Sequence, residues 1–223
     1  MPKKTNGKKR TARGLTPQQK KEAKLIASSL FNSQVERKTF GFLDENRQLI
    51  HNKGDYVDKF LKCKQGTEDP NDLTTQLVRI GDEFMLREIN IRLWLSNKKD
   101  RPNVMYKCYL FWYDVATALD DASMFFTQQN KMLDRLNTEY VSIIDQKTIF
   151  SGPSYAGTEN EHSYLCTLKG KWKNRKVIYD EGGTDPRTRD IGLAVVAYDA
   201  FGTLQTDNIA SYAYNSNVII QDP

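Results

Sequence analysis

Two runs of alternating residues limit what this chain can fold into. From position 88 to 95 every second residue is Ile or Leu, and the residues between them are Glu, Asn, Arg and Trp. From 106 to 113 the two alternating sets are both large and mostly aromatic. A period of two is that of a β-strand, whose side chains point to opposite faces in turn. We therefore predict a strand with one buried face at 88–95 and a strand covered on both faces at 106–113.

The rest of the chain behind position 35 repeats this pattern. Clusters of turn-forming residues fall between the candidate strands, and Met132, Leu133 and Leu136 suggest one short helical turn. The further strand candidates are 39–43, 141–150, 162–172, 191–198 and 209–220. About eight strands with long connections favour a double-sheet jelly roll over an up-and-down barrel, whose hairpins are short. We predict that residues 36–223 form one all-β domain, a single eight-stranded antiparallel jelly roll built as a two-sheet β-sandwich.

The N-terminal segment differs sharply in charge from this domain. The first 24 residues hold nine of the 33 Lys and Arg and one of the 28 Asp and Glu, a net charge of +8 that leaves 24 basic and 27 acidic residues elsewhere. These nine residues, our candidate nucleic-acid-binding set, are Lys3, Lys4, Lys8, Lys9, Arg10, Arg13, Lys20, Lys21 and Lys24. No large apolar side chain lies between positions 3 and 14, so we predict disorder over residues 1–15. A polyanion such as nucleic acid is the expected partner; a nuclear-import signal and a passive solubilising tail are the alternatives.

A helix is predicted at 16–31, within a basic, partly helical arm of residues 1–35. Thr16 supplies an N-cap hydroxyl, Pro17 suits the first helical position, and Gln19 completes a capping box. An apolar stripe at helical spacing follows, formed by Ala23, Ile26, Ala27 and Leu30. A short helix needs a partner for such a stripe. It is expected either between protein and nucleic acid or packed at the edge of the domain.

Several function classes find no support in the sequence. No apolar run is long enough to span a membrane, and no secretory signal is recognised. The three cysteines, Cys63, Cys108 and Cys166, lack CxxC spacing. Cys108 and Cys166 lie in strand-like runs and are expected to be buried, reduced thiols, which indicates an intracellular protein. His51 and His162 lie far apart, and no nucleophile or phosphate-loop motif occurs. We expect no enzyme activity, no cofactor and no metal site. Three acidic loop groups are interpreted as turn residues, with Ca²⁺ between subunits as the alternative. They are Asp69 and Asp72, Asp120 and Asp121, and Asp180 with Glu181 and Asp185.

A basic arm on an all-β domain is the layout of a small icosahedral coat protein, and the sequence resembles one such family. It is similar to capsid proteins of small circular single-stranded DNA viruses that encode a replication initiator, on the side of that group resembling the satellite tobacco necrosis virus coat. The segments that carry the resemblance are VRIGDEF (78–84), DRPNVMYKCYLFWYD (100–114), NKMLDRLN (130–137), IIDQKTIFSG (143–152), EHSYLCTLKGKWK (161–173) and GTLQTDNIASYAYNSNVIIQDP (202–223). These are strand and turn segments rather than catalytic motifs. The arm departs from circovirus arms, which are longer and rich in arginine.

The resemblance implies a viral capsid protein that self-assembles into a T=1 shell of 60 copies, with the arm inward and a single-stranded DNA genome as cargo. It implies location in the virion, passage through the host nucleus during assembly, and contacts with nuclear import machinery and a host attachment factor. The alternative from the residues alone is a monomeric β-sandwich module that binds nucleic acid or glycan and carries a basic tail. A shell subunit should expose apolar patches that neighbouring copies cover. The aromatic residues on both faces of 106–113 favour the shell.

Overall fold

The computed structural model describes residues 15–34, 37–66, 78–150, 162–201, 204 and 206–221. The chain divides into two compact units, residues 1–36 and residues 37–223; we call the second unit the body. The first unit contains α1 (Pro17–Gln34). In chain order the body contains β1 (Arg37–Phe40), β2 (Leu43–Ile50), β3 (Gly54–Val57), β4 (Lys64–Gln65), β5 (Val78–Arg79), β6 (Glu83–Asn97), β7 (Val104–Asp114), α2 (Asp121–Met124), β8 (Val141–Phe150), β9 (Ser163–Ile178), β10 (Arg189–Asp199) and β11 (Asn208–Gln221).

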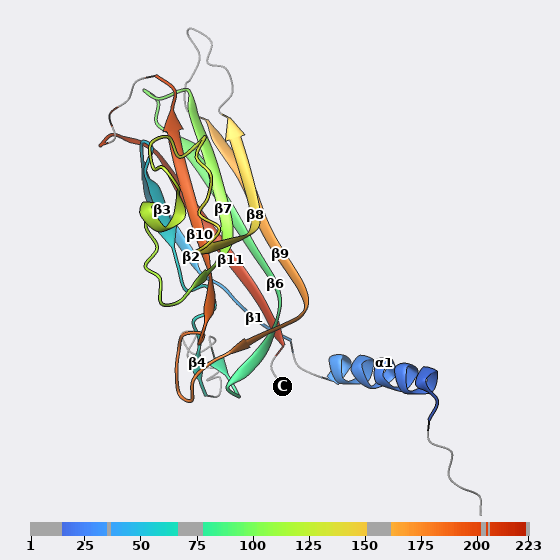
Figure 1. The fold of residues 1–223 in the computed structure, drawn as a ribbon. Helices are drawn as coiled ribbons and strands as arrows, with labels where there is room; N and C mark the ends of the chain where they lie inside the picture. The colour runs from blue at the N-terminus through green and yellow to red at the C-terminus, as the bar shows by residue number, and fades with distance from the viewer. Residues whose placement is uncertain are drawn as a thin grey trace, which may run out of the picture. The chain divides into compact units, whose positions relative to one another are not determined.

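The body is a sandwich of two antiparallel sheets (Figure 1). Sheet A has the order β1-β11-β6-β9, with β2 also paired to β11, and sheet B has the order β3-β10-β7-β8. Strands β1 and β2 follow each other along one edge of β11, so together they form the first of eight long strand positions. Counted this way, sheet A joins the first, eighth, third and sixth positions, and sheet B the second, seventh, fourth and fifth. This is the jelly-roll order, and the predicted fold class is confirmed.

The junction between β1 and β2 requires a residue without a side chain. A Cβ atom on Gly41 would lie 1.9 Å from the backbone oxygen of Ser216, because β11 passes directly beside it. The Ser216 amide donates to the carbonyl of Phe42 at 2.8 Å, and the Phe42 amide donates to the Ser216 hydroxyl at 2.9 Å. Glycine therefore lets the chain stay hydrogen-bonded to β11 while it passes from β1 to β2.

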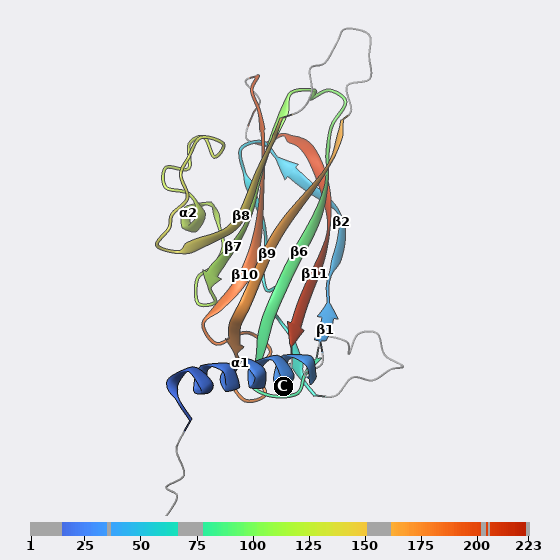
Figure 2. The same cartoon turned by 90° about the vertical axis from the view of Figure 1, so that its right-hand side faces the viewer.

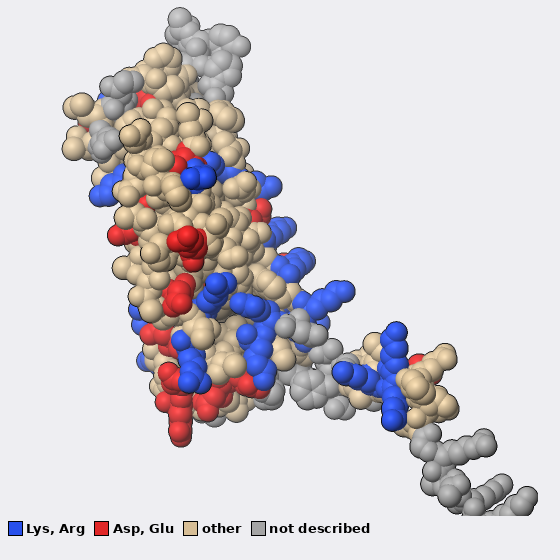
Figure 3. All heavy atoms as spheres, viewed as in Figure 1, with Lys and Arg blue, Asp and Glu red and all other residues tan. Residues whose placement is uncertain are grey.

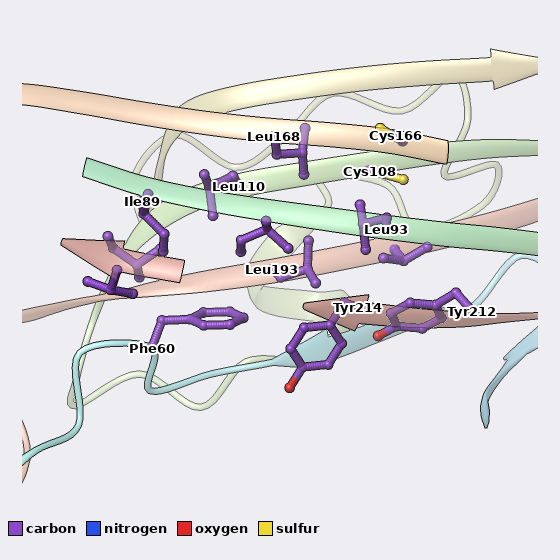
Figure 4. Close-up of a cluster of buried hydrophobic side chains, with 14 of the residues drawn as sticks. Phe60, Ile89, Leu93, Cys108, Leu110, Cys166, Leu168, Leu193, Tyr212 and Tyr214 are labelled. Carbon is purple, nitrogen blue, oxygen red and sulfur yellow. The ribbon is translucent and has the colours of Figure 1, made fainter. Parts of the chain in front are cut away.

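The main core lies between the two sheets (Figure 4). Ile89, Ile91, Leu93 and Leu95 of β6 are fully buried in it, whereas Arg92 and Trp94 are exposed, so the predicted phase of this strand is confirmed. Cys108 of β7 and Cys166 of β9 face the same core from opposite sheets (Figure 4). All three cysteines are free and buried.

The outer face of sheet B is covered as well. Every residue from Cys108 to Tyr113 is buried, which confirms the prediction that this strand is covered on both sides. The connection between β7 and β8, which contains α2, lies beside sheet B (Figure 2). Met124, Phe125 and Met132 of this connection form a second apolar cluster with Tyr109, Phe111 and Tyr113. The chain therefore covers its own second aromatic face. These aromatic residues therefore do not indicate contacts with other copies, and that prediction was wrong.

The same connection contains the predicted helical turn in part, because the amide of Asp134 donates to the Asn130 carbonyl at 2.8 Å. Residues 131–133 form a turn, and Leu136 makes an isolated bridge with Phe125. The helix of this connection is α2, eight residues earlier, and it begins with a capping box between Asp120 and Ser123. Of the three apolar residues, Met132 is buried, Leu136 is half-buried and Leu133 is 85% exposed. The capping side chains of Asp120 and Ser123 set the start of the helix itself, α2, outside this segment.

Asp190, at the start of β10, is a buried carboxylate of the core. Its Oδ1 atom accepts hydrogen bonds from the amides of Ile191 at 2.6 Å and Leu61 at 3.0 Å. Its Oδ2 atom is buried without a hydrogen-bond partner among the described residues. Burial raises the pKa of Asp190 to about 7, and nearby Asp185 and Asp58 add to the shift.

This raised pKa makes stability fall as pH rises. The folded state holds a proton on Asp190 that the unfolded state has already released above its ordinary pKa of about 3.9. Ionisation should therefore cost about 2–3 kcal/mol of unfolding free energy between pH 5 and pH 8. We expect the unfolding free energy of Asp190→Asn, relative to wild type, to increase by this amount across that range, measured by denaturant titration.

The comparison of the variant with the wild type cancels the contribution of His51. Burial lowers the pKa of His51, so its contribution to stability rises with pH, opposite in sign to that of Asp190. Asp114→Asn, an exposed carboxylate on the neighbouring strand β7, serves as the matched control and should show no such increase. If Asp190→Asn differs from wild type by the same amount at both pH values, the buried carboxylate does not set the pH dependence.

Candidate nucleic-acid interface

The helix of the first unit starts with the capping box that the sequence predicts. The amide of Gln19 donates to the Thr16 hydroxyl at 3.3 Å, and the amide of Thr16 donates to the Gln19 side-chain oxygen at 3.0 Å. Helix α1 runs Pro17–Gln34, three residues beyond the predicted end at 31. Two orphan N–H groups of the first turn are thereby satisfied, so the position of the helix start is set locally.

Three of the nine candidate basic residues lie on this helix. Lys20, Lys21 and Lys24 are exposed, and because they stand three and four positions apart they present neighbouring charges on the helix surface. The other six, Lys3, Lys4, Lys8, Lys9, Arg10 and Arg13, lie outside the described residues. The structure therefore places three residues of the predicted set and leaves the other six as a prediction.

The helix also exposes apolar side chains within its unit. Leu25 and Ile26 are 63% and 61% exposed, and Ala27 is exposed too. The side chain of Leu30, which completes the predicted stripe, lies outside the described residues. A helix with lysines and uncovered aliphatic residues has both an electrostatic and an apolar reason to acquire a partner.

The body carries basic residues that sequence reasoning overlooked. Lys and Arg side chains gather along the edge that β9 forms (Figure 3). Lys169, Lys171 and Lys173 are exposed because their strand neighbours Leu168, Gly170 and Trp172 face inward. Lys171 pairs with Glu88 of β6 at 3.1 Å. The sequence contains the pattern that predicts this basic edge: Lys occupies every second position of KGKWK. The period of two that located the strand also places these lysines on one face of it.

The outer face of sheet A also presents an apolar pair. Trp94 of β6 and Leu165 of β9 lie directly opposite each other in the strand register. They are 57% and 86% exposed. Large side chains paired this way on a strand face contact each other but leave most of their surface in water.

His51 and two of the acidic loop residues have structural partners. The Nδ1 atom of His51 accepts a hydrogen bond from the Asp199 amide at 3.1 Å, and its ring contacts Tyr198. Asp121 accepts hydrogen bonds from the Gly54 amide and the Tyr56 hydroxyl and pairs with Lys131. Asp180 pairs with Arg187. Within the described ranges no three His, Cys, Asp or Glu residues group as a metal site would require, whereas Asp69 and Asp72 lie outside those ranges.

Neither described helix has the length and apolar character that crossing a bilayer requires. This finding covers only the part of the chain that the structure describes.

Comparisons with known proteins show similarity of structure only. No protein-family model matches the sequence, and no curated protein is similar to it. The chain is similar to one in the structure of turnip yellow mosaic virus (8% identity over 85% of this chain and 96% of that chain, TM-score 0.35). It is also similar to chains of desmodium yellow mottle tymovirus (7% identity, 85% and 89%, TM-score 0.38) and of the infectious bursal disease virus Gx strain (10% identity, 83% and 32%, TM-score 0.35). At these scores the likeness is too weak to indicate what this chain binds or assembles into, and the jelly roll is assigned from its strand order.

Proposed function

We propose that this chain is a viral capsid protein that self-assembles into a small icosahedral shell and packages single-stranded DNA through its basic arm. The observation that carries the proposal is a jelly-roll body joined to a separate N-terminal unit that holds the excess positive charge. Jelly rolls serve as capsid, lectin and cupin domains. Of these, a capsid function accounts for both the body and a strongly cationic arm, because a genome needs counterions inside its shell.

The surface of the body supports association with further copies. The exposed pair Trp94 and Leu165 on sheet A is of the kind that subunit contacts cover. In the first unit, Leu25, Ile26 and Ala27 of α1 are uncovered as well. We propose that α1 becomes buried against the same helix of neighbouring subunits. The resemblance suggests three copies at a threefold axis on the inner surface.

The finer assignments follow from the family resemblance of the sequence. We propose a T=1 shell of 60 copies, an arm of residues 1–35 directed inward, and residues 36–223 as the capsid domain. The virion is the proposed location. The proposal includes assembly in the host nucleus, with residues 2–4 and 8–10 as the import signal and a host attachment factor as an outer partner.

Imaging of the purified protein tests the assembly. We expect the full chain to form closed particles of a single size in negative-stain micrographs, and to elute at the corresponding volume in size-exclusion chromatography. Adding single-stranded DNA should increase the particle yield, because neutralised arms no longer repel one another. A protein that stays monomeric at high concentration with DNA present would contradict the shell and favour the monomeric binding module.

A further inference from the structure

One end of the body sandwich contains a pocket that the proposed function does not use. It lies where β9 ends and β10 begins, and its volume is about 300 Å³. Trp112 of β7 contributes an aromatic ring to its lining, and the second tryptophan, Trp172, lies edge-on to that ring at 5.5 Å. We call this the end pocket. Its volume matches the lower end of small-ligand sites, enough for one compact chemical group.

Cationic side chains line the end pocket from two strands and a loop. They are Arg175 and Lys176 of β9, Arg187 of the connecting loop, and Arg189 at the first position of β10. Two of them are already paired: Lys176 with Glu83 at 2.7 Å and Arg187 with Asp180 at 3.5 Å.

The two remaining arginines have no ion pair among the described residues. The guanidinium of Arg175 lies over the ring of Trp112, 4.6 Å from its centroid. Arg189 stands opposite Asp114 in the register of β10 and β7, but the Asp114 carboxylate accepts a hydrogen bond from the Ala116 amide and forms no ion pair with it. The end pocket therefore holds two guanidinium groups that form no ion pair with a carboxylate among the described residues.

This combination of groups defines the chemistry of a ligand. A guanidinium presents several N–H donors in a fixed plane that matches the oxygens of a phosphate, and two of them can bind one phosphate together. An arginine that already lies on an indole ring has lost part of its rotational freedom, so less entropy remains to be lost on binding. We propose that the end pocket binds a phosphate group, supplied either by a free nucleotide or by a nucleic-acid strand.

The site is separate from the arm that the proposed function assigns to DNA. Its residues come from β7, β9, β10 and the loop before β10, all within the body. The proposal does not depend on shell assembly, so particle formation and phosphate binding are measured independently and either can fail alone.

Tryptophan fluorescence can report on this pocket specifically. The chain has three tryptophans, and Trp94 lies exposed on the outer face of sheet A. In a Trp94→Phe background, one remaining indole, Trp112, lines the end pocket, and the other, Trp172, packs edge-on against it at 5.5 Å. The full chain with this change is titrated with inorganic phosphate, thymidine monophosphate and a short oligothymidylate, at one ionic strength held with sodium chloride. We expect a saturable change in emission.

Two variants and one control decide the outcome. Arg175→Gln and Arg189→Gln should each weaken thymidine monophosphate binding at least about tenfold, since each removes a charge-assisted contact. Arg189 is exposed, so its variant tests the site even if Arg175→Gln perturbs the fold. The control Arg92→Gln, an exposed arginine on sheet A, should bind as the background does.

The three probes identify the source of the phosphate. If the oligothymidylate binds more tightly than the mononucleotide, and this difference disappears in the Arg189 variant, the ligand is a nucleic-acid strand. Equal affinities for the two probes indicate a free nucleotide. Absence of saturable binding by all three probes overturns the proposal. Equal weakening by Arg92→Gln overturns it too, because the effect would then come from overall charge.

Discussion

Neutralising the N-terminal charges is expected to flatten the salt dependence of single-stranded DNA binding by about two thirds. Each phosphate neutralised on a single strand contributes about −0.7 to the slope of log affinity against log salt. Nine engaged cations give a slope of roughly −6, and the three on α1 alone give about −2. The change replaces six residues with glutamine: Lys3, Lys4, Lys8, Lys9, Arg10 and Arg13.

The measurement is a fluorescence titration of labelled DNA from low to moderate salt. Glutamine keeps the chain length constant, and a second variant that lacks residues 1–14 separates charge from length. Both should keep the fold of the body, because residues 1–36 and residues 37–223 form two distinct compact units. Binding should not depend on base sequence, since phosphate contacts read no bases. An unchanged slope would mean that the body binds the DNA and that the arm serves only for import.

The end pocket refines this expectation. A bound DNA strand could also place a phosphate between Arg175 and Arg189. The salt slope of the glutamine variant should then be steeper than the value expected for α1 alone. The difference should be about one to two phosphate contacts, or roughly −0.7 to −1.4. Adding Arg189→Gln to the glutamine variant should remove part of that remainder.

Truncating Leu93 to alanine is expected to cost about 2–5 kcal/mol of unfolding free energy. Leu93 is fully buried between the sheets, and its register partners are Tyr214 of β11 and Cys166 of β9 (Figure 4). Removing its isopropyl group leaves a cavity that two rigid sheets cannot close, so the lost transfer energy and the cavity both count. Denaturant titration of the unassembled subunit measures the effect.

Its neighbour provides the matched control. Arg92 points to the outer face of sheet A and is exposed, so Arg92→Ala should change the unfolding free energy by less than about 0.5 kcal/mol. A Leu93→Ala cost as small as that of the control would contradict the packing of β6 against sheet B.

The strands that the sequence predicts well are those whose periodicity is clear. The candidates at 88–95 and 106–113 lie within β6 and β7, and the candidate at 141–150 coincides with β8. Those at 162–172, 191–198 and 209–220 lie at β9, β10 and β11, with somewhat different ends. The observed strand ends differ from the predicted ones because the last residues of a strand are extended through pairing with the neighbouring strand, whatever their own apolar pattern.

The predictions failed where a strand has no apolar pattern of its own. The segment LDENRQLI forms β2, yet only its last residues have the apolar side chains that are typical of a half-buried strand. It is extended because its backbone pairs with β11, and Arg47 on it binds the Asp55 carboxylate at 2.7 Å. The candidate at 39–43 was therefore wrong in its bounds: the chain forms β1 and β2 on either side of Gly41 and Phe42. The short strand β3 was missed for the same reason.

The sequence by itself determined the properties that depend on neighbouring residues. Charge segregation, the capping box of α1 and the alternation of β6 and β7 are local, because each follows from residues within a few positions of one another. Tertiary structure alone decided what depends on strands distant in the chain. The connection between β7 and β8 covers the aromatic face of sheet B, and the pairing of sheet A brings Trp94 beside Leu165. The end pocket likewise exists only because sandwich packing brings Arg175 onto Trp112 and sheet pairing places Arg189 beside them. Such contacts depend on the register between strands that are distant in the chain, and local periodicity does not predict that register.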